Sequence, residues 1–188
     1  MPLLFSILTG LGLSTAAGLN AYLPLLIVGL FARLGWMPLE GPFMVLAHPL
    51  VLLIIAALAV VDFIGDKVPA IDSMLHTAGL VIAPLAGLVL FLSQSGAAEL
   101  DPLVAGIAGL VVAGSTHVAR AAIRPAVTAA TVGTGNPVVS FIEDLLSIVL
   151  AVLAVLLPAL SIILIALLIV VAVRFFRRAV GVWGGRAR

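Results

Sequence analysis

The polar stretch at residues 62–76 holds the side chains that are best suited to chemistry. It reads DFIGDKVPAIDSMLH and carries three carboxylates, one lysine and one histidine, in a chain with 9% charged residues. Asp62 lies four residues before Asp66. Asp72 lies four residues before His76, so each pair shares a face wherever the chain is helical. Carboxylate oxygens with an imidazole suit Mg²⁺ or Mn²⁺, or a proton relay.

A second acidic pair, Glu143 and Asp144, follows Pro137 by six and seven residues inside an apolar run. Ionisable groups at membrane depth are costly and usually face the interior of a bundle or a wet cavity. We therefore expect both carboxylates to be buried, and we hypothesise that they meet the polar stretch in one substrate or ion pathway. The candidate pathway residues are Asn20, Asp62, Asp66, Asp72, His76, Asn136, Glu143 and Asp144.

Two alternatives for the polar stretch stay open. Residues 62–72 could form a solvated cytoplasmic loop, in which Lys67 pairs with Asp66, while Asp72 could cap the following helix. A membrane-embedded enzyme acting on lipid headgroups would instead need four side chains to hold a metal ion: Asp62, Asp66, Asp72 and His76. No recognised ligand spacing supports that site, and the chain contains no phosphate-binding loop, HExxH or GxSxG motif. We therefore favour a non-enzymatic role over the membrane-embedded enzyme, and we expect no cofactor.

Arg120 and Arg124 form a basic pair four residues apart, on one face of an expected span. Two guanidiniums at the cytoplasmic end of a span could bind a lipid phosphate or an anionic substrate. They could equally be ordinary topology determinants. His117, three residues before Arg120, is most simply explained as a hydrogen-bonding residue between helices.

The composition is that of a membrane protein. The chain has 188 residues and is 64% hydrophobic, whereas soluble domains are about half apolar and about a quarter charged. We expect an all-α, polytopic transmembrane helical bundle in one domain, residues 1–176, with a basic cytoplasmic tail at 177–188. The net charge of +1 argues against nucleic-acid binding, and the absence of cysteine excludes disulfides and thiolate metal sites.

Six spans are expected, at residues 3–32, 43–61, 74–92, 102–119, 138–157 and 159–173. The first run would be about 45 Å long as a helix, against a hydrocarbon core of roughly 30 Å. Pro24 removes a backbone donor and clashes with the carbonyl of Asn20, so we predict a kink or break there. Residues 125–137 are rich in Thr and Gly, and are expected to form an exposed loop or a re-entrant segment that lines a cavity.

The placement of basic residues favours six spans over five spans with a long last helix. With six spans and both termini inside, eight Lys and Arg residues are cytoplasmic and only Arg33 is outside. With five spans, six Lys and Arg residues are cytoplasmic and three are outside. The positive-inside rule therefore favours the arrangement of six spans, with cytoplasmic N- and C-termini. In that arrangement Pro158 lies in a hairpin turn rather than at a kink.

A weak inverted repeat is also conceivable, because small transporters are often built that way. Residues 14–24 align without gaps onto 115–125, and residues 60–66 resemble 138–144 at a different offset. An inverted repeat would require the first and fourth spans to run in opposite directions.

Three segments together resemble a known family: GLGLSTAAGLNAYLPLL at 10–26, IDSMLHTAG at 71–79 and TGNPVVSFIEDLLS at 134–147. They are similar to a bacterial integral-membrane family catalogued as a domain of unknown function, with a GLSxAxG opening, a PxxD turn and a GNPxxxxxE segment. The second motif matches from Pro69 to Asp72, and the third matches from Gly135 to Glu143. The resemblance implies a multi-span bacterial inner-membrane protein and supplies no activity.

The leading functional hypothesis is a small permease or channel-like transporter of an unidentified small solute, ion or lipid. We expect it to be a homo-oligomer, since the abundant Gly and Ala allow helices to approach closely. The alternative is a non-transporting scaffold or accessory subunit, whose polar residues hold helices together and dock an unidentified membrane partner.

Overall fold

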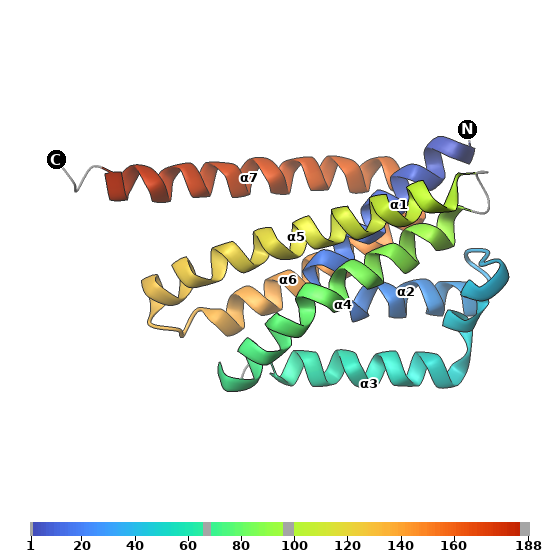
Figure 1. Ribbon diagram of the computed structural model, residues 1–188, viewed down its shortest axis with the longest axis horizontal. Coiled ribbons are helices and arrows are strands. Elements are labelled where there is room, and N and C mark those ends of the chain that lie inside the picture. Colours follow the sequence, from blue (N-terminus) through green and yellow to red (C-terminus); the bar gives the residue numbers. More distant parts are fainter. Residues whose placement is uncertain (1, 66–68, 96–99, 185–188) are drawn as a thin grey trace.

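The computed structural model describes residues 2–65, 69–95 and 100–184, and within these ranges the chain is all helical and contains no strand (Figure 1). The predicted all-α bundle is therefore confirmed. The helices in chain order are α1 (Pro2–Leu19), α2 (Tyr22–Arg33), the short 3-10 helix η1 (Gly41–Ala47), α3 (Pro49–Gly65), α4 (Pro69–Ser95), α5 (Pro102–Thr131), α6 (Asn136–Leu156) and α7 (Pro158–Gly184).

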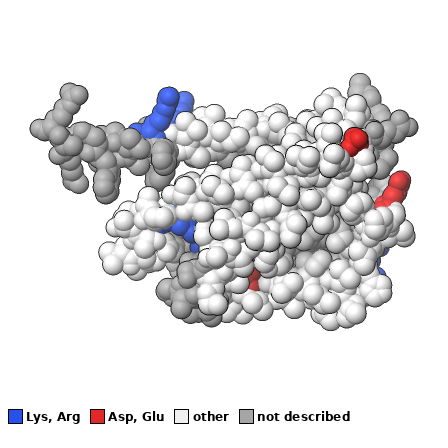
Figure 2. Space-filling view, in the orientation of Figure 1, with Lys and Arg blue, Asp and Glu red and all other residues white. Residues whose placement is uncertain are grey.

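The helices are those of a multi-pass membrane protein. Within the described ranges, three are long and apolar enough to cross a membrane: Met74–Gln94, Pro102–Thr131 and Asn136–Leu156. A fourth span is present if η1 and α3, which meet at 64°, count as one bent crossing. Three further helices are apolar but shorter. Charged atoms cover little of the face in Figure 2, as expected for a surface that contacts lipid.

The first apolar run is a helical hairpin rather than a single span. The chain breaks at Asn20 and Ala21, as the proline pattern predicted, but α2 then turns back. Gly12 of α1 packs against Ala154, near the far end of α6, so α1 runs antiparallel to α6. Gly29 of α2 packs against Leu52, near the start of α3. The start of α1 and the end of α2 therefore lie on the same side of the bundle, as Figure 1 shows.

This hairpin changes the placement of the N-terminus. In Figure 1 the chain reverses direction between α6 and α7, so Pro158 lies at a hairpin turn, as predicted. Helix α1 begins at the end of the molecule where α7 begins, and α7 finishes at the opposite end. The described ends of the chain therefore lie at opposite ends of the bundle, because residues 3–32 return to the side from which they start, whereas six spans with both termini on one side were predicted.

The segment at 125–137 is the end of a long helix rather than a re-entrant segment. Helix α5 continues through Pro125 to Thr131, and a tight turn then leads to α6. Two successive residues in the turn, Val132 and Gly133, have positive φ values of 52° and 85°. This left-handed backbone reverses the chain over a few residues, so no separate segment enters the bundle.

The inverted repeat is wrong as well. Helices α1 and α5 both pack antiparallel to α4. Along α1, Gly10 lies against Phe91 and the Ser14 hydroxyl donates to the Gly87 carbonyl; along α5, Gly109 lies against Gly87 and His117 lies against Gly79. Helices α1 and α5 therefore run in the same direction, which an inverted repeat forbids. The aligned segments also differ in structure, since α5 stays helical where the first apolar run breaks.

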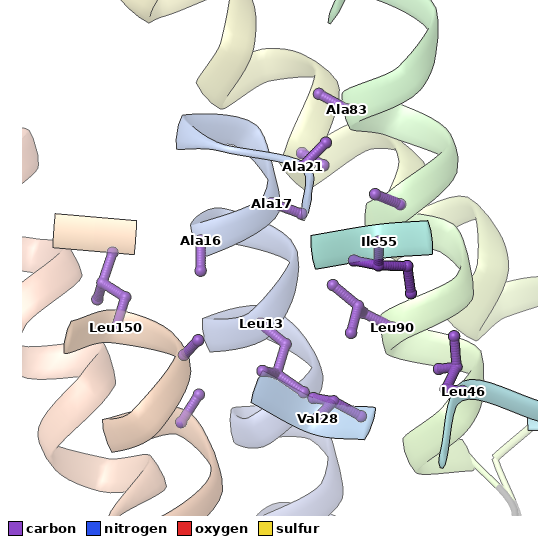
Figure 3. Packing of buried hydrophobic residues seen from close by; sticks show 14 of the residues in the cluster. Leu13, Ala16, Ala17, Ala21, Val28, Leu46, Ile55, Ala83, Leu90 and Leu150 are labelled. Atoms are coloured by element: carbon purple, nitrogen blue, oxygen red, sulfur yellow. The ribbon is translucent and has the colours of Figure 1, made fainter. Parts of the chain in front are cut away.

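Small residues let the central helices approach closely. The buried core gathers around α1 and includes Leu13, Val28, Leu90 and Leu150, each fully buried (Figure 3). Between α4 and α5 the backbones touch through glycines, because a methyl group on Gly109 would collide with the carbonyl oxygen of Gly87. Packing of this kind is the main source of helix association in a membrane, where lipid tails are as apolar as leucine.

This contact gives a stability test. Gly109→Ala should destabilise the bundle by about 1–3 kcal/mol, since the added methyl group must displace backbone atoms of α4. Gly106→Ala on the same helix is the control, because its nearest neighbours are Leu side-chain atoms at 3.7 Å, an ordinary contact. Thermal unfolding of the purified proteins in detergent measures the difference. Equal melting temperatures for both variants would contradict the close α4–α5 packing.

Candidate functional site

Asn20 lies at the break between α1 and α2 and completes the start of α2. Its side-chain Oδ1 accepts hydrogen bonds from the backbone N–H groups of Tyr22 at 3.0 Å and Leu23 at 3.2 Å. The first N–H groups of a helix have no partner within the helix, and a side-chain oxygen is the usual substitute. The Asn20 side chain therefore provides the hydrogen-bond acceptor for the backbone N–H groups that the chain reversal leaves without a partner in the helix.

The carbonyl groups at the end of α1 are satisfied by other helices. The Ser147 hydroxyl of α6 lies 3.4 Å from the Asn20 carbonyl, and it also donates at 2.9 Å to the Ala16 carbonyl, which already accepts from the Asn20 backbone N–H. Arg120 of α5 donates from Nη1 to the Leu19 carbonyl. Lipid offers no hydrogen bonds, so a broken helix inside a membrane depends on such protein partners.

The amide of Asn20 also joins two carboxylates from distant parts of the chain. Its Nδ2 donates to Asp144 Oδ1 at 2.8 Å and to Asp62 Oδ2 at 3.0 Å. Asn20 is 3% exposed and Asp144 is 7% exposed, so the contact lies inside the protein. Of the predicted pathway residues, these three are brought together, with Asn20 in the middle.

The second carboxylate of the α6 pair faces the basic residues of α5. Glu143 Oε2 accepts from Arg120 Nε at 2.7 Å and from Arg124 Nη2 at 3.0 Å. The three side chains are only 9–12% exposed. Because both guanidiniums have a carboxylate partner within the bundle, the arrangement does not support the predicted role in binding lipid phosphate. We call the six residues the polar cluster: Asn20, Asp62, Arg120, Arg124, Glu143 and Asp144.

Two hollows adjoin the polar cluster, and Asn20 lines both. The smaller is a cavity of about 30 Å³ between the hairpin, α3, α4 and α5, and its polar lining includes Asn20, Tyr22, Asp62, His76, His117 and Arg120. That volume suffices for about one or two water molecules. The larger is an open groove of about 350 Å³ between α2, α3 and α6, which Asp144 also lines.

The two histidines meet across α4 and α5. The ring centroids of His76 and His117 are 5.0 Å apart, and Nε2 of His117 lies 3.3 Å from the His76 carbonyl oxygen. The predicted role of His117 as a hydrogen-bonding residue between helices is confirmed. Its position beside the cavity and Arg120 was missed.

Other sequence candidates lie elsewhere. Asn136 hydrogen-bonds the Thr128 hydroxyl, at 3.0–3.1 Å, in the turn between α5 and α6, rather than joining the polar cluster. Asp66 and the side chain of Asp72 lie outside the described residues. Within the described part of the chain, no three His, Asp or Glu side chains are grouped so that they could hold a metal ion. Ser147 was missed, although its position three residues after Asp144 places both on one face of α6.

The comparison with known families agrees with the sequence resemblance. Residues 7–178 match the family of a domain of unknown function, DUF4126. The match covers most of the chain, so the protein belongs to this family, and the predicted family resemblance is confirmed. No curated protein and no solved structure matches the chain.

The ion pairs of Glu143 provide a test of its structural role. Glu143→Gln removes a carboxylate charge that accepts from two buried guanidiniums, so we expect a loss of about 3–5 kcal/mol in the free energy of unfolding. Glu40→Gln is the control, because Glu40 is exposed and its side chain makes no capping bond to η1. The measurement is chemical or thermal unfolding in detergent. If the two variants are equally stable, the Glu143 ion pairs do not hold the bundle together.

Proposed function

We propose that this DUF4126 protein is a small membrane permease or channel-like transporter, whose substrate site is the polar cluster at the α1–α2 break. The observation that carries the proposal is the Asn20 amide, which holds carboxylates from α3 and α6 at the tip of a broken helix. Transporters commonly place substrate and ion sites where helices are interrupted. Unwound backbone is stable at membrane depth where protein or a wet cavity surrounds it.

The depth of the site supports this proposal. Asp144 is eight residues from the start of α6 and twelve from its end, so it lies about 12 Å and about 18 Å from the two helix ends. These distances place the carboxylate well inside a hydrocarbon layer of roughly 30 Å. A carboxylate at such depth is costly and marks a functional pathway more often than a packing contact.

The charges of the polar cluster favour a positively charged substrate. Two of its carboxylates, those of Asp62 and Asp144, accept from the same Asn20 amide nitrogen and therefore lie close together. Two carboxylates held this close repel each other, and a bound cation or a proton relieves that repulsion. The imidazoles of His76 and His117 line the small cavity beside Asn20 and Asp62.

Transport through the site is tested in proteoliposomes that carry gradients of protons, Na⁺ or K⁺. We expect the wild-type protein to dissipate at least one gradient, followed with an internal pH dye or ion indicator. Asp144→Asn should slow that flux at least about tenfold, because it removes a charge that stabilises a cation by about 1.4 kcal/mol or more. Glu40→Gln, an exposed carboxylate remote from the cluster, should leave the flux unchanged. Absence of all three fluxes in the wild type would contradict a cation or proton transporter and would favour a scaffold.

We further propose that the protein lies in the bacterial inner membrane with the last turns of α7 on the cytoplasmic side. Arg174 and Arg177 belong to that end of α7, which Figure 2 shows as the basic end of the visible face. Arg120 and Arg124 lie toward the same end of the bundle, while Arg33 closes α2 at the other end. This distribution satisfies the positive-inside rule with the N-terminus outside.

Reporter fusions test this orientation. A fluorescent protein that folds only in the cytoplasm should be bright when it follows residue 188, and alkaline phosphatase should be active when it precedes residue 1. Activity of cytoplasmic reporters at both termini would show that α1 and α2 together cross the membrane, against the hairpin.

A homo-oligomer remains our expectation for the assembly. A bundle of this size is thin, and a pathway is more easily enclosed at a subunit interface than within one chain. The mass of the protein in detergent or in nanodiscs determines the number of subunits.

A further inference from the structure

The groove beside Asp144 has the size and lining of a small-molecule site. Its volume of about 350 Å³ lies in the usual range for such sites, roughly 300–1,000 Å³. Its walls are apolar, and polar groups enter it at one place, where Asn20 and Asp144 lie. The wall side chains include Leu23, Leu26, Ala56, Phe63, Leu145 and Ile148.

The mouth of the groove faces the surroundings of the bundle rather than its interior. Val60 and Phe63 of α3 are 56% and 41% exposed, and Phe141 and Leu145 of α6 are 55% and 50% exposed. Exposed apolar side chains on membrane helices contact lipid tails. A molecule that enters the groove therefore comes from the hydrocarbon layer, and not directly from water.

We infer that the groove binds a hydrophobic cation, meaning an organic molecule with an apolar body and a positive charge. This inference rests on the proposed function and names the substrate class for the same site. The apolar body would contact the walls from α2, α3 and α6, while the charge would lie against Asp144 and the Asn20–Asp62 contact. The small cavity on the other side of Asn20, at about 30 Å³, holds water or passes a proton but is too small for an organic solute.

Charge complementarity favours this occupant over a lipid tail or a second copy of the chain. A hydrocarbon tail or an apolar helix would match the walls, but it would cover the carboxylate of Asp144 with apolar groups. Covering a carboxylate with hydrocarbon carries a large desolvation cost, which a cation compensates by direct attraction. The Asp62 carboxylate, held to the same Asn20 amide, acts in the same direction.

A binding measurement with matched probes tests the inference. The probes are methyltriphenylphosphonium, a hydrophobic cation, and 1,1,1-triphenylethane, a neutral molecule of nearly the same shape. Binding to the full-length protein in nanodiscs is measured with radiolabelled probe, and empty nanodiscs give the background. We expect saturable binding of the cation and at least about tenfold weaker binding of the neutral probe.

Two neighbouring alanines on α3 provide matched variants. Ala56 lines the groove, whereas Ala57 is exposed and is not among the lining residues. Ala56→Phe should fill the groove and reduce binding of the cation at least about tenfold, while Ala57→Phe should leave it unchanged. Asp144→Asn should reduce binding of the cation and leave the weak binding of the neutral probe unaltered. The alanine pair tests the site even if Asp144→Asn does not fold.

The outcomes separate this inference from the proposed function. Equal binding of both probes would show that the groove holds lipid tails or another apolar surface, and equal effects of the two alanine variants would place the site elsewhere. Either result overturns the inference. Flux of protons, Na⁺ or K⁺ without phosphonium binding would also overturn the inference of a hydrophobic-cation site, but it would support the proposed transport function. Phosphonium binding that depends on Ala56 and Asp144, without flux of any ion or of the phosphonium, would support the site and contradict transport.

Discussion

The break between α1 and α2 is the constraint on which the rest of the structure depends. A helix interrupted within the bundle exposes N–H groups at the start of α2 and carbonyl groups at the end of α1, and lipid can satisfy neither. The asparagine at the tip provides the acceptor for the N–H groups. Ser147 and Arg120 provide the donors for the carbonyls, so α6 and α5 must both lie against the hairpin tip. The positions of α5 and α6 are thereby fixed by the hydrogen-bonding needs of the hairpin tip.

The same contacts gather charge, so the residues that support the hairpin are also those of the proposed substrate site. Arg120 completes α1 and also pairs with Glu143, while Asp144 faces the hairpin tip and Asp62 of α3. Consecutive residues on a helix point in different directions, so Glu143 and Asp144 belong to different contacts although they are neighbours in sequence. One carboxylate balances the cations that support the broken helix. The other faces the groove, where it can meet a substrate.

Much of this arrangement follows from the sequence, but the direction of the chain does not. Composition indicates a membrane bundle, and Pro24 indicates a break near Asn20, because both are local properties. Whether the chain then continues or turns back depends on partners more than a hundred residues away, which no local pattern reveals. The structure of the Thr-rich segment at 125–137 was also not predicted from its local sequence. Helix α5 continues past Pro125, and the hydroxyls of Thr128 and Thr131 are satisfied within it by the carbonyls of the preceding turn.

The position of Asn20 links the two hollows in the proposed transporter. It lines both the small polar cavity and the apolar groove, so a path between them passes its amide. That amide holds Asp62 and Asp144 together, and the other end of the same side chain caps α2. In the proposed transporter, a cation bound at Asp144 would compete with the amide for the carboxylate, and loss of that bond would loosen the side chain that caps α2. Substrate binding and movement of the hairpin would then be coupled through one side chain, without a separate gate.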